Sequence, residues 1–172
     1  LVKKVKLDKK ETGGSLFDRL SVVGAELLIE TLKGLEEGTI TPVPQDDTKS
    51  SYVKMLKKSM GELDFSRTAH DIECLIRGLN PWPSAYTHYN GKMLKIWDAD
   101  VISDVSGIGS EENAVETNAA CGTVCLVDKK RLIIKCGKDY LSVNEVQLEG
   151  KKRMKTDAFL LGCRVEKGTV LK

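Results

Sequence analysis

The stretch Ile76-Arg77-Gly78-Leu79-Asn80-Pro81-Trp82-Pro83-Ser84-Ala85-Tyr86-Thr87 divides the chain into a helical part and a strand-rich part. Each of its prolines lacks a backbone N–H, fixes φ and pushes the preceding residue toward extended geometry. A helix must therefore end at Asn80. Trp82 is expected to form a buried corner that locks this helix onto a β domain. The alternative is that Asn80 and Trp82 face a ligand.

Upstream of this stretch, the apolar pattern predicts two helices. Leu1–Leu7 alternates loosely and predicts a short strand, and the turn 12–15 can cap the helix that follows. Apolar residues at spacings of three and four place one face of that helix between residues 16 and 35: Leu16, Phe17, Leu20, Val23, Leu27, Leu28, Leu32 and Leu35. The first 40 residues offer this face no adequate packing partner. A second helix, capped by Asp64 or Ser66, is expected to run up to Asn80.

Downstream, the period changes to that of strands. Asn90-Gly91 is a strong signal for a type I′ hairpin turn. The strands are expected at 85–89, 93–102, 122–127, 131–136 and 140–148, with a solvated loop at 103–118. Thr156 can cap a short helix at 157–161. Five antiparallel strands at this spacing predict a closed, OB-like barrel, so the fold class is α+β.

Composition sets limits on function. The 172 residues include 27 Lys and Arg against 25 Asp and Glu, a net charge of only +2, so nucleic-acid binding must rest on local clusters. No apolar run is long enough for a membrane span. Five cysteines without a C-x-x-C pair, and only two histidines, argue against a zinc site and favour reduced thiols in the cytoplasm.

The sequence predicts no catalytic constellation. His70 and His88 are interpreted as satisfied surface histidines, and Asp98 and Asp100 as solvated acids that share a strand face, with a metal or acid–base pair as the alternative. Three basic clusters are more informative, because lysines that face phosphates bind nucleic acid without regard to sequence. They are Lys54, Lys57 and Lys58; Lys129, Lys130 and Arg131; and Lys151, Lys152, Arg153 and Lys155.

Five separated motifs resemble methionyl-tRNA formyltransferases, in the order found in that family. They are TGGSLFDRL at 12–20, Pro44-Gln45 followed by Ser51-Tyr52, the stretch 58–65, NPWP at 80–83 and QLEGKKRM at 147–154. Phe65 stands where the family often has Trp, and Ser59-Met60 where it has acids. The resemblance implies transfer of a formyl group from formyl-tetrahydrofolate to the amino group of methionine on initiator tRNA.

The resemblance also implies a division of the chain into three parts. Residues 1–45 would be the end of the Rossmann-like catalytic domain, 46–60 a linker, and 61–172 an OB-like tRNA-binding domain. The family's catalytic Asn, His and Asp motifs are absent and would lie upstream of Leu1. We therefore expect this chain to be a fragment that is inactive alone, contains no catalytic residue and binds neither folate nor metal.

The resemblance assigns roles to particular residues. Contacts with initiator tRNA are expected from Lys57, Lys58, Lys151, Lys152 and Arg153. An architectural role is expected for Arg77 and for Asn80, Pro81, Trp82 and Pro83. Two alternatives remain: a formyltransferase of the same plan that acts on a sugar-nucleotide amine, and a non-enzymatic OB-like interaction domain. The apolar face of the helix at 16–35 could make the fragment oligomerise.

Overall fold

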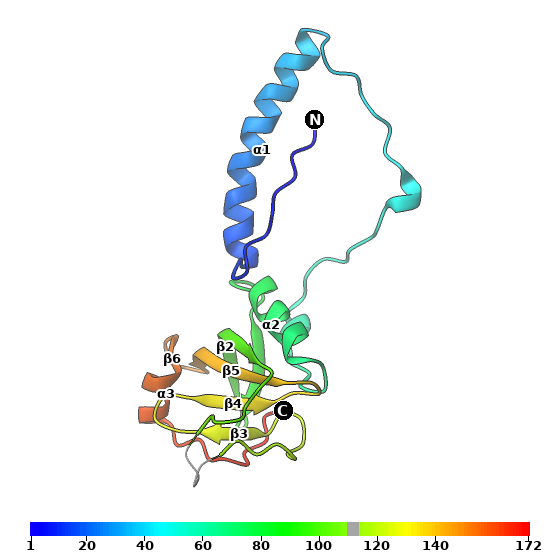
Figure 1. The fold of residues 1–172 in the computed structure, drawn as a ribbon. Helices are drawn as coiled ribbons and strands as arrows, with labels where there is room; N and C mark the ends of the chain where they lie inside the picture. Colours follow the sequence, from blue (N-terminus) through cyan, green and yellow to red (C-terminus); the bar gives the residue numbers. More distant parts are fainter. Residues whose placement is uncertain (110–113) are drawn as a thin grey trace. The chain divides into compact units, whose positions relative to one another are not determined.

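A computed structural model describes residues 1–109 and 114–172. The chain forms two compact units, Leu1–Leu56 and Lys57–Lys172, which are described one at a time (Figure 1). Within the described ranges, no helix combines the length and the hydropathy that a membrane span requires. The expected solvated loop at 103–118 lies partly outside these ranges, because residues 110–113 are not described.

The first unit consists of one long helix and extended chain. Helix α1 (Gly13–Glu36) begins at Thr12, whose Oγ1 accepts a hydrogen bond of 3.1 Å from the Ser15 N–H, as the sequence predicts. A single-turn 3-10 helix, η1 (Asp47–Lys49), interrupts the following segment. The apolar face of α1 is largely exposed, with Phe17 74% and Leu32 57% accessible. Residues 1–40 thus leave much of this face uncovered, as the sequence predicts, although Leu16, Val23 and Leu27 are half-buried.

The predicted strand at Leu1–Leu7 is wrong. This segment is extended but has no strand partner among the residues that the structure describes. A strand exists only where a neighbouring strand satisfies its N–H and C=O groups, and the first unit contains no other strand. The alternating pattern was therefore correct about extended backbone and wrong about pairing.

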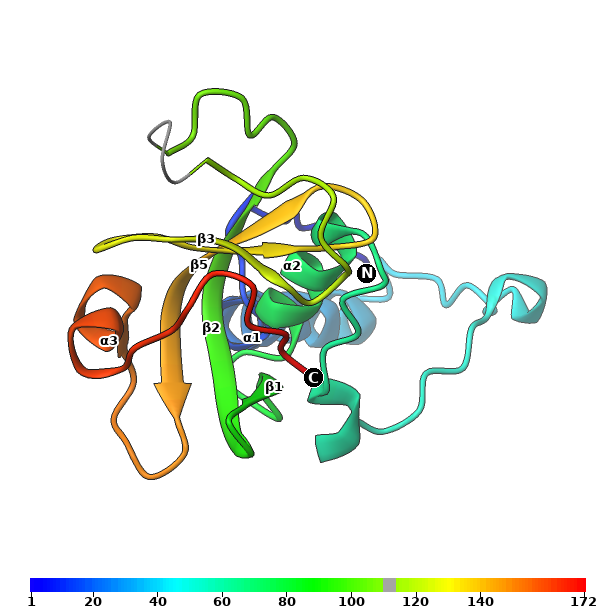
Figure 2. The ribbon, with the colours of Figure 1, turned by 90° about the horizontal axis from the view of Figure 1, so that it is seen from below.

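The second unit is a sheet with helices packed on it. Its elements are η2 (Lys58–Gly61), α2 (Ala69–Gly78), β1 (Ala85–Tyr89), β2 (Lys92–Ile102), β3 (Val124–Val127), β4 (Leu132–Lys135), β5 (Tyr140–Leu148), β6 (Met154–Lys155) and α3 (Thr156–Gly162). The antiparallel strands follow the order β1-β2-β5-β4-β3, and β6 pairs with β5. Figure 2 shows α2 beside the long strands β2 and β5. The α+β class is therefore observed.

The core of this unit forms between α2 and the sheet. Ile72 and Ile76 lie on one helical face and are 1% exposed, and they belong to the same buried cluster as Leu94 and Ile96 of β2. Burying side chains of this size contributes about 1.5–3 kcal/mol each. The hairpin between β1 and β2 turns at Asn90 and Gly91, both with positive φ (49° and 73°), which confirms the predicted turn.

Two helix caps differ from the prediction. Helix α2 begins after Thr68, whose side chain accepts a hydrogen bond of 3.0 Å from the Asp71 N–H, whereas Asp64 is bonded to Ser66 instead. Helix α3 already includes Thr156, and the hydroxyl of this threonine donates to the Val143 carbonyl at 2.7 Å. Thr156 is therefore a buried link to β5 rather than a cap.

The expected burial of Trp82 is also wrong. Trp82 is 55% exposed, whereas Leu79 and Ser84 on either side of the prolines are 4% and 1% exposed. The Ser84 N–H donates to the Leu79 carbonyl at 2.9 Å, which closes a turn after α2. Both peptide bonds before the prolines, Asn80–Pro81 and Trp82–Pro83, are cis. The turn presents the indole outward and keeps the flanking residues buried.

The sheet is open along its strand pairings. Strands β1 and β3 are its two ends, and no pairing between them is found among the described residues, so the predicted closed barrel is not confirmed. The C-terminal segment 168–172 lies against both ends. The His88 N–H of β1 donates to the Lys172 carbonyl at 2.7 Å, and the Val124 N–H of β3 donates to the Thr169 carbonyl at 2.8 Å.

Candidate nucleic-acid interface

Two lysines of the first predicted cluster are positioned by η2, whereas Lys54 lies in the first unit. Lys57 and Lys58 begin this single turn, and both are exposed. The turn is fixed at its other end, because a Cβ on Gly61 would lie 2.1 Å from the Ser84 carbonyl oxygen. The next residues continue against β1, where the Leu63 N–H donates to the Tyr86 carbonyl at 2.9 Å. The backbone therefore holds this pair of cations at the outer edge of β1.

Most of the cluster at 151–155 occupies the turn between β5 and β6. Lys151, Lys152 and Arg153 are all exposed there. The Gln147 side-chain amide donates to the Lys151 carbonyl at 3.0 Å, which ties the turn to the end of β5. Arg153 also forms an ion pair with Glu145, so its charge is partly neutralised, whereas no acidic partner is found for Lys151 and Lys152 among the described residues.

The strand register relates the elements that carry these two clusters. One row crosses the sheet through Glu62, Tyr86, Lys95 and Gln147, each paired with the next. Because neighbouring strands lie about 4.8 Å apart, the row spans roughly 14 Å. The clusters therefore flank the β1–β2 hairpin on either side instead of touching.

The remaining cluster, at the turn between β3 and β4, is less available for an external anion. The Arg131 guanidinium bonds to Asp128 at 2.6 Å. Partial burial opposes ionisation of Asp128, but the Lys130 N–H and the Arg131 side chain hold the pKa of this carboxyl below its usual value. Lys129 and Lys130 remain exposed.

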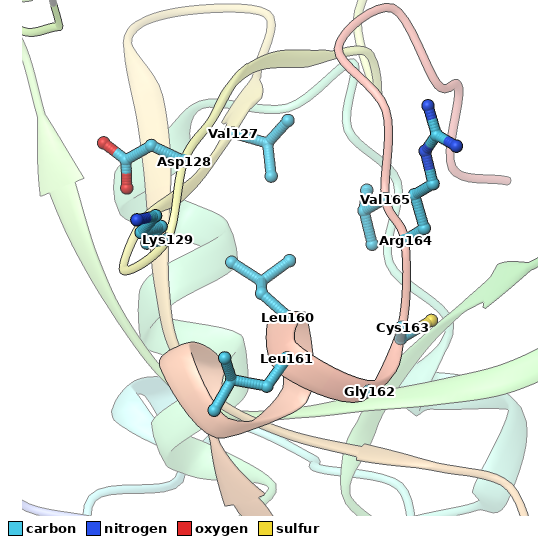
Figure 3. A pocket seen from close by; sticks show the side chains of 9 residues that line it. All are labelled: Val127, Asp128, Lys129, Leu160, Leu161, Gly162, Cys163, Arg164 and Val165. Atoms are coloured by element: carbon cyan, nitrogen blue, oxygen red, sulfur yellow. The ribbon is translucent and has the colours of Figure 1, made fainter.

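A cavity of about 470 Å³ lies between this turn and α3 (Figure 3). Its lining is mainly aliphatic, with Leu160 pointing toward Val127, while Arg164 and Cys163 point away from it. The charged groups lie at the rim. The cavity therefore lacks the convergent polar groups that acid–base chemistry requires.

One residue of the NPWP motif, Asn80, contacts a strand of the sheet. Asn80 Nδ2 donates to the Trp97 carbonyl at 3.2 Å, which links the end of α2 to the middle of β2. At Trp97 the register between β2 and β5 shifts, as in a β-bulge. Asn80 thus satisfies a carbonyl at an irregular point of the strand.

The remaining polar candidates are engaged with one another. His88 Nδ1 lies 3.2 Å from the Lys172 carbonyl, and the Asn144 amide donates to both Asp98 (2.9 Å) and Asp100 (2.7 Å). These contacts favour the interpretation of His88 as satisfied and show the two acids sharing one amide donor.

One group of potential metal ligands lies on α2. Single ligand atoms of His70, Glu73 and Cys74 lie within 4.8 Å of one another. Arg77 Nε bonds to the Glu73 carboxylate at 2.6 Å, and its Nη2 lies 3.4 Å from Cys74 Sγ. A guanidinium inside the group disfavours a second cation, so we assign no metal here.

Two residues near the clusters did not emerge from the sequence as functional. Lys95 and Trp97 lie between the clusters on β2, and the cations of Lys95 and Arg153 lie over the Trp97 ring. The available signal was the Lys-x-Trp spacing, which places both side chains on one strand face. The link to Arg153 depends on the fold.

The second unit is thus an antiparallel sheet with cationic turns along one row, and its described residues form no catalytic constellation. A family model described as "Formyl transferase, C-terminal domain" matches residues 55–164, and the chain belongs to this family. The resemblance to the C-terminal part of methionyl-tRNA formyltransferases is confirmed by relatives of that name.

The matched relatives are longer than this chain. The chain is 60% identical over 171 residues to the methionyl-tRNA formyltransferase of Lachnospira eligens. This alignment covers 99% of the chain and 52% of the relative. The chain is 42% identical to that of Bacillus subtilis, again over 99% of this chain and 51% of the relative. The chain thus spans about half the length of the curated relatives it matches.

Solved structures support the fold. A variant of HypX from Aquifex aeolicus superposes with a TM-score of 0.57 at 12% identity, covering 90% of this chain and 27% of that one. HypX in complex with tetrahydrofolic acid gives 0.51 at 14% identity, covering 84% and 26%. At such identities the likeness concerns the fold alone.

Proposed function

We propose that this chain is the tRNA-holding C-terminal part of a methionyl-tRNA formyltransferase. The full-length protein would transfer a formyl group from formyl-tetrahydrofolate to the amino group of methionine on initiator tRNA. The observation that carries this proposal is the 60% identity over 99% of the chain to a protein of that name. Two exposed cationic turns on one sheet are the physical feature that suits such a role.

The proposed division of labour follows from which residues are present. Lys57 and Lys58 on one side of the β1–β2 hairpin, and Lys151, Lys152 and Arg153 on the other, would contact phosphates and place the acceptor end. Such contacts orient a nucleic acid without reading its sequence. Formyl transfer and folate binding would require residues outside this chain, so we expect no turnover from it.

Finer features of the architecture belong to the same proposal. Residues 1–45 would complete the catalytic domain, 46–60 would be the linker, and 61–172 the tRNA-binding domain. The latter would be an OB-like barrel in which segment 168–172 joins β1 to β3, because this segment hydrogen-bonds to both. The whole protein would be cytoplasmic. In the isolated chain, the exposed apolar face of α1 would be a self-association surface, which sedimentation at several concentrations would detect.

Binding of initiator tRNA across a salt series tests the function. Affinity should fall steeply with salt, and Lys58→Ala should flatten the slope of log K against log salt by about 0.7–0.9 for one lost contact. Lys10→Ala, in the turn before α1 in the first unit, removes the same charge and should leave the slope unchanged. A chain that binds a nucleotide sugar but not tRNA would favour the alternative formyltransferase, and a chain that binds neither would favour a protein-interaction domain.

A further inference from the structure

The outer surface of β2 and β5 carries a cluster that the two lysine turns do not explain. Lys95 Nζ lies 5.6 Å from the centre of the Trp97 ring, and Arg153 Cζ lies 4.8 Å from it. Both distances are within the range of cation–π attraction, for which tryptophan is the strongest partner. One indole thus holds two cations from separate elements, a set called here the Trp97 clamp (Lys95, Trp97 and Arg153).

The geometry of Trp97 favours this role over simple packing. Its indole Nε1 is buried and lacks a hydrogen-bond partner among the described residues, which costs stability. A phenylalanine would avoid that cost but would offer a weaker face to cations. The register shift around Trp97 is of the kind that redirects a side chain, and Asn80 fixes the local backbone.

The charges of the clamp are suited to an anion. Arg153 already pairs with Glu145. Lys95 has no carboxylate partner within ion-pair distance in the described part of the chain, so it holds an uncompensated positive charge beside a second cation. A phosphate bound beside such a lysine would offset the repulsion between the cations and form a charge-assisted hydrogen bond.

The position of Lys95 connects the two turns. It lies in the row Glu62–Tyr86–Lys95–Gln147, between the chain that follows Lys58 and the strand end that carries Lys151. A row of roughly 14 Å is long enough to meet more than one phosphate along a single strand of nucleic acid. Without Lys95 the middle of that row would lack a cation.

We propose that Lys95 contacts a phosphate of the bound RNA and that Trp97 is a positioning residue, which holds Lys95 and Arg153 in place for it. This inference rests on the proposed tRNA binding. It makes one continuous cationic track from Lys57 to Lys152 across the β1–β2 hairpin.

The test uses the whole chain, labelled initiator tRNA and a potassium chloride series. Lys95→Gln, which removes only the charge, should reduce the salt slope by about 0.7–0.9. The control Lys138→Gln removes the same charge from an exposed turn near α2 and should leave the slope unchanged. Trp97→Phe should not lower the unfolding midpoint, because it removes the unpartnered N–H, and should lower the slope. Adding Lys95→Gln to it should then have a smaller effect than in the wild type, as expected for coupled residues.

Equal slopes for Lys95→Gln and Lys138→Gln would overturn the proposal. If Lys58→Ala flattens the slope and Lys95→Gln does not, the clamp is wrong and the proposed function stands. If the wild-type chain does not bind initiator tRNA at any salt concentration, both are wrong.

Discussion

Replacing Gly61 by alanine should destabilise the second unit and displace the turn that carries Lys57 and Lys58. A Cβ at this position would lie 2.1 Å from the carbonyl oxygen of Ser84, which is buried and belongs to the backbone, so the strain cannot be relieved by a change of rotamer. Overpacking of this kind costs about 1–3 kcal/mol. Any movement of η2 that relieves this contact would also weaken the 2.9 Å hydrogen bond from the Leu63 N–H to the Tyr86 carbonyl. Losing that bond costs about 1 kcal/mol.

We therefore expect a loss of about 2–3 kcal/mol, or roughly 8–12 °C in Tm for a unit of this size. Both tryptophans, Trp82 and Trp97, lie in the second unit, so their fluorescence in urea reports its unfolding separately from α1. The matched control is Gly78→Ala at the end of α2, where nothing lies within 4 Å of the added Cβ. That change should stabilise by up to about 1 kcal/mol. A Gly61→Ala chain as stable as wild type, or two variants that shift in the same direction, would refute the reasoning.

Three further changes test local features of the second unit. Thr68→Ala removes the hydrogen-bond acceptor of the Asp71 N–H and should lower the unfolding free energy by about 1 kcal/mol. Thr68→Ser keeps a hydroxyl and should largely restore it, so equal losses of unfolding free energy for the two variants in urea would contradict the cap. Tyr89→Phe deletes a 2.8 Å hydrogen bond to the Arg164 carbonyl and should cost about 1 kcal/mol, so an unchanged urea midpoint would count against this bond. Burial raises the pKa of the Cys136 thiol to about 12. The contribution of this protonated thiol to stability is complete below the unfolded-state pKa of about 8.5 and declines as pH rises toward 12. Above pH ~9, the wild-type unfolding free energy should therefore fall by up to about 1.4 kcal/mol per pH unit relative to that of Cys136→Ala. Parallel plots of unfolding free energy against pH for the two proteins would exclude this contribution.

Local chemistry predicted much of the second unit. The hairpin at Asn90-Gly91 requires residues that tolerate positive φ, and this requirement is visible in the sequence itself. The strand segments were likewise placed by their apolar period. Choosing Thr68 over Asp64 as the cap was not possible, because three capping residues occur within five positions. The choice depends on the Ala69 N–H, which donates to the distant Lys138 carbonyl at 2.9 Å.

The candidate interface was less predictable than the fold. Residue type marks Lys57 and Lys151 as cationic, but their separation is set by strand register across the β1–β2 hairpin. Trp82 shows the same difficulty, since its size predicts burial whereas the turn directs it outward. Trp97 was overlooked because its partner Arg153 is 56 positions away in the sequence and meets it only after β5 and β6 have paired.

The contacts of segment 168–172 have a consequence for synthesis. Until these residues leave the ribosome, both β1 and β3 expose unpaired backbone groups, although every other strand contact can already form. Bare strand edges are templates for association between chains. A nascent or proteolytically trimmed molecule without residues 168–172 would therefore be prone to aggregate even with the rest of its core in place, and this segment would act as a safeguard against that.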